Sequence, residues 1–132
     1  MPVIVETPNS PSEQDRGDLA KIYADAPDWL LAPYASAAEL VTCGEADGLL
    51  FTGRFNDRLL GAALLERGET HWRLSHLCVR KVTRHRGVGR RIVEEAVRLA
   101  RESGKSLHLA APLDHLECQA LAAHLHLPLE SL

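Results

Sequence analysis

The feature that most constrains this chain is a β-prone run that passes through a basic loop and two glycines into an amphipathic helix. The run covers residues 74–79, the loop covers residues 80–86, and the glycines are Gly87 and Gly89. In the helix that follows, apolar residues recur at four-residue spacing and charged residues fill the opposite face. Such a stripe is typical of a helix that packs on a core. The stretch therefore predicts a strand, a turn and a helix in immediate succession.

The charges around the predicted helix start are unusual for a purely structural element. The first turn of a helix has unpaired backbone N–H groups and a partial positive charge, so carboxylates are favoured there. A bound polyanion would remove the repulsion between cations and this helix end, and the two glycines would let backbone N–H groups approach it. The pattern favours a phosphate-binding turn over a solvated basic helix start. The cations around the turn are Arg84, His85, Arg86, Arg90 and Arg91.

The glycine spacing separates this turn from other phosphate loops. A G-x-G-x-x-G dinucleotide fingerprint would need glycine at Ile92, and a Walker A loop ending at residues 104–106 would need glycine at Leu99. The remaining pattern, Arg84-x-x-Gly87-x-Gly89, resembles the acyl-CoA signature R/Q-x-x-G-x-G/A of the GNAT acetyltransferases. The resemblance implies that acetyl-CoA is bound, with its pyrophosphate on the turn and its pantetheine arm along the preceding strand. By matching position, the implied cofactor-binding residues are Leu77, Cys78 and Val79 on the strand, and Thr83, Arg84, His85, Arg86, Gly87, Val88, Gly89 and Arg90 on the turn.

The rest of the chain predicts the other elements of a GNAT fold. Asn56 and Asp57 tolerate the positive φ values of a tight hairpin turn, and Ser12 and Ser36 suit helix N-caps. The order β-α-α-β-β-β-α-β-α predicts an α/β fold with a mixed sheet and a short or missing last strand. A chain of 132 residues suits one domain, residues 1–132. The expected elements outside the central stretch are strands at 2–6, 49–55, 58–66, 72–79 and 106–110 and helices from 12, from 36 and at 116–127.

Composition narrows the class of partner. The net charge is −3, and the positive charge is concentrated in residues 80–91, which suits a small polyanion better than nucleic acid. The three cysteines form no disulfide framework, and the start of the chain lacks the regions of a signal peptide. No apolar run approaches the length that spans a bilayer, about 20 residues. We therefore expect a reduced, cytoplasmic protein with neither a nucleic-acid nor a membrane partner.

Three stretches resemble one family within the GNAT superfamily, PanZ (also called PanM), the maturation factors of aspartate 1-decarboxylase. The resemblance covers the chain from about residue 12 to residue 93, and the sequence departs from the family from His108 onward. It implies binding of acetyl-CoA and of the decarboxylase zymogen, whose self-cleavage to the pyruvoyl form the family promotes. It thereby implies a link between acetyl-CoA level and pantothenate synthesis. The stretches are Ser12-Glu13-Gln14-Asp15-Arg16 with Asp18-Leu19 and Lys21-Ile22, Phe55-Asn56-Asp57-Arg58-Leu59-Leu60, and Val79-Arg80-Lys81-Val82-Thr83-Arg84-His85-Arg86-Gly87-Val88-Gly89.

Acetyl transfer to an amine needs a general base and an acid for the leaving thiolate. In GNAT enzymes the acid is often a tyrosine on the last helix, whereas Tyr23 and Tyr34 lie near the N-terminus of this chain. The strand before the turn carries no carboxylate; Glu66, Glu69 and His76 are possible bases, each expected to be a surface group or a satisfied strand residue. No catalytic residue is assigned. These features favour a regulatory binding protein, and the alternative is an N-acetyltransferase acting on a small amine or a protein N-terminus.

Two further groups of reactive side chains carry weaker signals. Cys78, on the predicted cofactor strand, is expected to be a small buried residue rather than an acyl-accepting nucleophile. Near the C-terminus, the spacing of the metal-ligating residue types matches no zinc-site pattern, so no metal is expected. These residues are His115, Cys118, His124 and His126.

Overall fold

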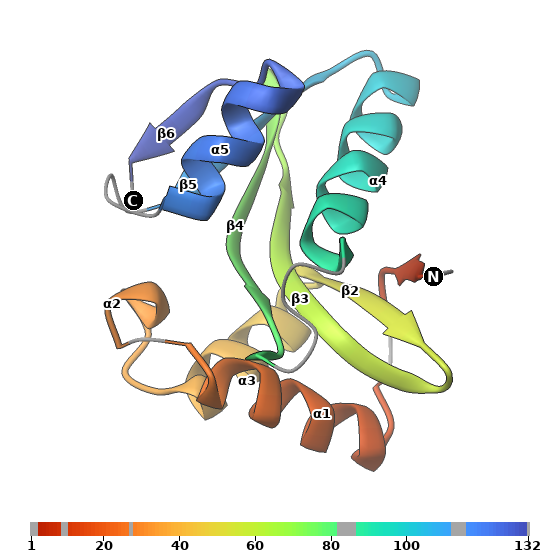
Figure 1. The fold of residues 1–132 in the computed structure, drawn as a ribbon, viewed down its shortest axis with the longest axis vertical. Helices are drawn as coiled ribbons and strands as arrows, with labels where there is room; N and C mark the ends of the chain where they lie inside the picture. The colour runs from red at the N-terminus through yellow and green to blue at the C-terminus, as the bar shows by residue number, and fades with distance from the viewer. Residues whose placement is uncertain (1–2, 9–10, 27, 82–86, 112–115, 132) are drawn as a thin grey trace.

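A mixed sheet with its strands in chain order organises the computed structural model, which describes residues 3–8, 11–26, 28–81, 87–111 and 116–131 (Figure 1). Pairing is antiparallel from the first strand to the fourth and parallel from the fourth to the sixth. Within the described residues the strands are β1 (Ile4–Glu6), β2 (Leu50–Phe55), β3 (Arg58–Arg67), β4 (His71–Val79), β5 (Ser106–Ala111) and β6 (Leu129–Ser131).

Helices cover both faces of this sheet. The helices are α1 (Glu13–Ala24), α2 (Asp28–Leu31), α3 (Ala37–Ala46), α4 (Val88–Glu102) and α5 (Leu116–Leu125). One buried cluster joins α4 and α5 to Phe51, Leu65 and Leu74 of the sheet. A second cluster joins α1 and α3 to the other face, through Leu64 and Cys78. The sheet is therefore the middle layer of three.

Local sequence signals predicted most of these elements. The hydroxyls of Ser12 and Ser36 accept hydrogen bonds from the third backbone N–H of α1 and α3, at 3.1 Å each. Asn56 and Asp57 form the hairpin turn with φ values of 49° and 67°. The last strand is present but short, and α5 ends at Leu125, two residues before its predicted end. The element order confirms the GNAT-type α/β prediction.

A β-bulge in β4 changes which face its side chains occupy. Trp72 and Leu74 belong to the cluster under α4 and α5, whereas Cys78 belongs to the cluster under α1. Strict alternation would place all three on one face. The register with β3 shifts within this segment, where His76 has a φ of 54°. Because of this one extra residue, the side chains at the end of β4 lie on the faces opposite to those that uninterrupted alternation would give them.

Candidate functional site at the parting of two strands

The centre of the candidate site is the point where β4 and β5 part. Their parallel pairing runs from His71 and Ser106 to Ser75 and Ala110. Strand β4 continues to Val79 and stays paired with β3 to that residue. Figure 1 shows β4 extending well beyond β5 toward α1. Leu77, Cys78 and Val79, the predicted strand contacts, all lie on this extension.

The bulge that precedes the extension is held by buried hydrogen bonds. The ring of His76 is 4% exposed, and its Nε2 lies 2.7 Å from the carbonyl oxygen of Ala32. Because a carbonyl only accepts, Nε2 donates and Nδ1 accepts from the hydroxyl of Ser75 at 2.9 Å. The hydroxyl of Tyr23 donates to the carbonyl of His76 at 2.8 Å. These bonds fix the strand backbone where β5 departs.

The same burial determines the protonation of the two candidate proton carriers. Burial lowers the pKa of His76, so its ring is neutral at pH 7, with both nitrogens in hydrogen bonds. Burial also raises the pKa of Tyr23 well above its ordinary value. The expectation that His76 is a satisfied strand residue is confirmed. Glu66 and Glu69, the other candidate bases, are exposed surface groups.

The start of α4 has the features of an anion-binding helix end. Gly87 is its N-cap residue with a φ of 83°, a left-handed conformation that glycine adopts without a Cβ penalty. Among the described residues no side chain caps this end, and the first turn contains no acidic residue. Val88 is 1% exposed, so its side chain packs into the core and does not cover the turn. Arg90 is exposed and lies 3.6 Å from Glu94. The other predicted turn residues, 83–86, lie outside the described residues.

Gly61, which the sequence reasoning missed, lets α4 approach the sheet. A Cβ at this position of β3 would lie 2.9 Å from Cγ1 of Val88 and 3.0 Å from Cδ1 of Ile92. Both of those side chains are in the first two turns of α4. The absence of a side chain therefore sets the distance between β3 and the candidate phosphate-binding turn. In the sequence, the only signal was a glycine inside a β-prone run.

Asp25, at the C-terminal end of α1, anchors the entry to the turn. Its carboxylate accepts from the backbone N–H of Lys81 at 3.0 Å and from Nε of Arg80 at 3.3 Å. These bonds, that of Lys81 foremost, hold the pKa of Asp25 below its ordinary value. No local pattern predicts this contact, because 55 residues separate Asp25 from Arg80.

Two of the three stretches that carried the family resemblance meet in space. Asp18 on α1 accepts hydrogen bonds from Nε of Arg58 and from the backbone N–H of Leu59, both at 3.1 Å. Gln14 donates to the carbonyl of Asp57 at 3.1 Å. These bonds attach the first stretch to the β2–β3 hairpin; this stretch lies on α1, which also carries Tyr23 and is followed by Asp25.

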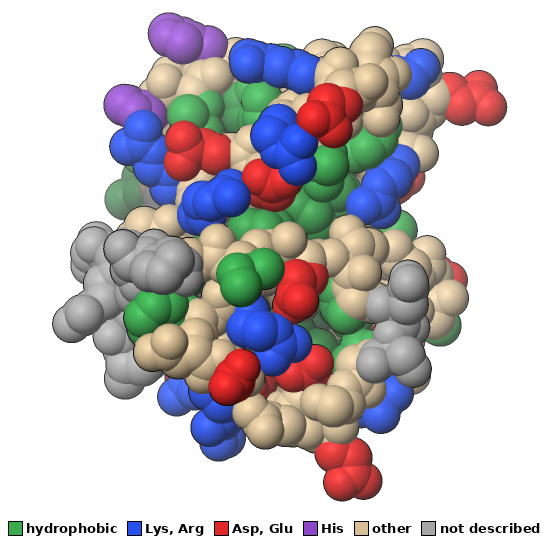
Figure 2. Space-filling model, turned by 90° about the vertical axis from the view of Figure 1, so that its right-hand side faces the viewer, with side chains coloured by type: hydrophobic (Ala, Val, Ile, Leu, Met, Phe, Trp, Pro, Cys, Tyr) green, Lys and Arg blue, Asp and Glu red, His purple; other side chains and the backbone are tan. Residues whose placement is uncertain are grey.

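The charged face of α4 carries mixed signs. Figure 2 shows basic and acidic side chains side by side on this part of the surface. Arg91 pairs with Glu95 at 3.0 Å, and Arg98 pairs with Glu102 at 2.6 Å and also with Glu95. The first two pairs join residues four apart and the third joins residues three apart, and each such pair on a helix surface contributes only about 0.2–0.5 kcal/mol.

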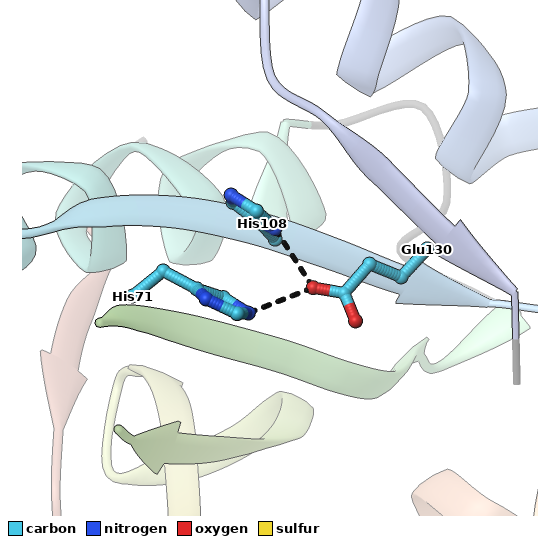
Figure 3. Close-up of side chains that lie close together, drawn as sticks. All are labelled: His71, His108 and Glu130. Carbon is cyan, nitrogen blue, oxygen red and sulfur yellow. Dashed lines mark hydrogen bonds and ion pairs between the residues drawn. The ribbon is translucent and has the colours of Figure 1, made fainter. Parts of the chain in front are cut away.

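The structure describes most of the other reactive side chains that the sequence singled out. Cys78 is buried, as expected, and its thiol donates to the carbonyl of Ile22 at 3.3 Å. Cys118 is also buried, His124 and His126 are exposed, and His115 lies outside the described residues. A different group with metal-ligand chemistry lies across three strands, and the sequence reasoning missed it. Its members are His71, His108 and Glu130 (Figure 3).

The sequence matches one known protein family over most of its length. A family model described as an acetyltransferase (GNAT) domain, PanZ, matches residues 2–129. A PanD regulatory factor of Salmonella typhimurium is 39% identical over 87 residues, and one of Escherichia coli is 38% identical over 87 residues. Each match covers 66% of this chain and 60% of the relative. The chain therefore spans less than two thirds of the length of these relatives.

Solved structures share the fold at low sequence identity. The PaiA N-acetyltransferase of Thermoplasma acidophilum, in complex with coenzyme A, superposes with a TM-score of 0.72 at 14% identity, covering 94% of this chain and 88% of that one. The ribosomal-protein-S18-alanine N-acetyltransferase of Escherichia coli gives a TM-score of 0.71 at 14% identity, covering 93% and 76%. Among the described residues, no helix combines the length and apolarity needed to cross a membrane.

Proposed function

Because the chain belongs to the PanZ family of GNAT acetyltransferase domains, we propose that it binds acetyl-CoA where β4 and β5 part. With acetyl-CoA bound, it docks on the zymogen of aspartate 1-decarboxylase and promotes self-cleavage to the pyruvoyl form. Relatives named PanD regulatory factors support this partner. In this role the protein links the level of acetyl-CoA to pantothenate synthesis.

The observation that carries the acetyl-CoA proposal is the position of the glycine-capped start of α4 beside the extension of β4. In this proposal the backbone of Leu77, Cys78 and Val79 pairs with the pantetheine arm. The N–H groups of Val88 and Gly89 face the pyrophosphate, because the first turn of a helix leaves such groups unpaired within the helix. A helix end without acidic side chains favours an anion at this place. The four turn residues 83–86 complete the proposed set: Thr83, Arg84, His85 and Arg86.

The surroundings of the acetyl group favour binding over turnover. A general base needs a free lone pair within reach of the amine proton. Nδ1 of His76 already accepts from Ser75, and Nε2 donates to Ala32. The hydroxyl of Tyr23 is buried and donates to a backbone carbonyl. Both groups are engaged in buried hydrogen bonds within the protein, which supports a regulatory role rather than an N-acetyltransferase.

We also place this function in the cytoplasm. None of the three cysteines among the described residues, Cys43, Cys78 and Cys118, forms a disulfide, which suits a reducing compartment.

The direct test mixes the protein with the unprocessed decarboxylase of the same organism, with acetyl-CoA, with CoA or with neither. Zymogen cleavage is followed on a gel, and release of free thiol is followed in the same samples. We expect faster cleavage only with acetyl-CoA and no thiol release above background. Unchanged cleavage would refute the partner. Thiol release that depends on an added amine would establish the N-acetyltransferase instead.

A matched pair of glycine variants tests the site. Gly87→Glu places a bulky anion at the start of α4, and Gly104→Glu places the same group just after its end. Both glycines have positive φ, 83° and 72°, and within the described part of the chain neither has an atom within 4 Å of an added Cβ. Backbone strain is therefore comparable in the two variants. We expect acetyl-CoA binding to be lost in Gly87→Glu and kept in Gly104→Glu; equal affinities would exclude this helix end as the site.

A further inference from the structure

We propose that His71, His108 and Glu130 form a zinc-binding site that joins β4, β5 and β6. The three side chains come from neighbouring strands and turn toward one another (Figure 3). Their ligand atoms all lie within 4.8 Å of one another. The site is on the sheet face opposite α4 and α5, because His108 alternates with Leu107 and Leu109 of the cluster beneath those helices. It is separate from the helix start proposed to hold the pyrophosphate.

The spacing of the ligand atoms fits a tetrahedral ion. Oε2 of Glu130 lies 3.0 Å from Nε2 of His71 and 2.8 Å from Nδ1 of His108. Zinc binds nitrogen and oxygen at about 2.0–2.2 Å, which places neighbouring ligand atoms roughly 3.3 Å apart. The two contacts to Oε2 would lengthen by a few tenths of an ångström on ion binding. The two imidazole rings stack, with centroids 3.9 Å apart and an angle of 20° between their planes. Because an imidazole binds a metal in the plane of its ring, the two rings must also tilt toward each other when the ion binds.

The hydrogen bonds within the group show what an ion would replace. Oε2 of Glu130 faces one nitrogen of each ring, and a carboxylate oxygen accepts, so both facing nitrogens donate when no ion is bound. Ion binding replaces these two hydrogen bonds, so the hydrogen on each facing nitrogen must leave it.

Thr70 is placed to accommodate that change at His71. Its hydroxyl lies 3.1 Å from Nδ1 of His71. A hydroxyl can donate to Nδ1 in the ion-free state and accept from it once Nε2 binds the ion. Such a partner to the second ring nitrogen accompanies most histidine ligands and fixes their orientation.

The ligand set selects the kind of ion. Two imidazoles and one carboxylate suit zinc, whereas magnesium and calcium prefer sites built from oxygen. Three protein ligands leave a fourth tetrahedral position for water. The positive charge of Arg73 acts on Glu130, so the affinity should be lower than that of a four-ligand structural zinc site. Binding would stabilise β6, an edge strand of three residues, by attaching it to β4 as well as to its neighbour β5.

The test titrates zinc chloride into chelator-treated, full-length protein by calorimetry. We expect one zinc per chain, no heat from magnesium chloride, and a higher melting temperature with zinc. Losing the hydrogen-bond partner of a metal ligand typically lowers metal affinity about 10–100-fold, so Thr70→Val should lower zinc affinity about 10-fold. His108→Ala removes a ligand itself and should lower zinc affinity by more than about 100-fold. His124→Ala, at an exposed histidine of α5, is the matched control and should bind as the parent does.

A second measurement needs no variant. Imidazole nitrogen chemical shifts recorded during the zinc titration should identify Nε2 of His71 and Nδ1 of His108 as the ligands. Absence of stoichiometric binding, or ligation by other histidines, would overturn the proposal. Equal affinity in His108→Ala and the parent would overturn it as well. None of these outcomes bears on acetyl-CoA binding, which is measured separately.

Discussion

Replacing Asp18 with alanine should destabilise the protein by about 2–3 kcal/mol. Asp18 is 2% exposed and bridges α1 to the start of β3, through Arg58 and the backbone N–H of Leu59. Leu59 is also 2% exposed, so losing the acceptor leaves a buried N–H without a partner, at a cost of about 1–3 kcal/mol. Arg58 is half exposed, so its ion pair adds at most about 1 kcal/mol.

The pH dependence of the same contact gives an independent check. The hydrogen bond from Arg58 holds the pKa of Asp18 below its ordinary 3.8, against the effect of burial. Its stabilisation is complete above pH 3.8 and is lost as the pH falls through the lower folded-state pKa. Asp18→Asn keeps an acceptor for Leu59 but cannot titrate. The stability gap between parent and Asp18→Asn should therefore narrow below pH 3.8.

Urea unfolding, followed by circular dichroism, measures both effects. A loss of 2–3 kcal/mol corresponds to a midpoint shift of about 1 M or more for a slope near 2 kcal/mol per M. Glu13→Gln, at an exposed position in the first turn of the same helix, is the control and should cost only about 0.3–1 kcal/mol. An Asp18→Ala midpoint equal to that of the control would refute the reasoning. So would a parent-to-asparagine gap that stays constant from pH 7 to pH 3.

Two other changes probe how the turn is positioned. Asp25→Ala removes the acceptor for the backbone N–H of Lys81. Acetyl-CoA affinity, measured by calorimetry, should therefore fall about 3–10-fold while the protein stays folded. Unchanged affinity would mean that Asp25 does not position the turn. Gly61→Ala inserts a methyl group 2.9 Å from α4 and should cost about 1–3 kcal/mol in urea unfolding. Gly17→Ala, in an exposed helix interior with open space around it, should instead stabilise by about 0.5–1 kcal/mol. Similar effects of the two glycine changes would contradict the close-approach account.

Elements specified by neighbouring residues could be predicted from the sequence. Ser12 and Ser36 cap helices through N–H groups three residues away, and Asn56-Asp57 closes a hairpin between adjacent runs. The conformation at the start of α4 is likewise determined by neighbouring residues, because Gly87 adopts a positive φ that glycine allows without a Cβ penalty. In each case the residues that determine the conformation lie within a few positions of one another.

The missed features depend on the register between distant segments. His71 meets Glu130 only because β4, β5 and β6 align as they do, and 59 residues separate the two. Asp25 reaches Lys81 across 56 residues. The bulge at His76 leaves no local composition signal, since its place is set by pairing with β3. A pattern with period two detects a strand but does not give its neighbour or its offset.

The bulge in β4 also has a consequence for chain length. Removing His76 would leave Leu77 and Val79 on the α4 side of the sheet and Cys78 on the α1 side, as they are now. It would restore uninterrupted alternation and remove the bend that a bulge introduces. The divergence of β4 from β5 therefore coincides with an insertion of one residue, whose bulge is held by the hydrogen bonds of His76 and Tyr23. Single-residue deletions in β4 should therefore have two different effects. Deleting His76 keeps the other side chains on their present faces, whereas a deletion before the bulge moves part of the strand's side chains to the opposite face.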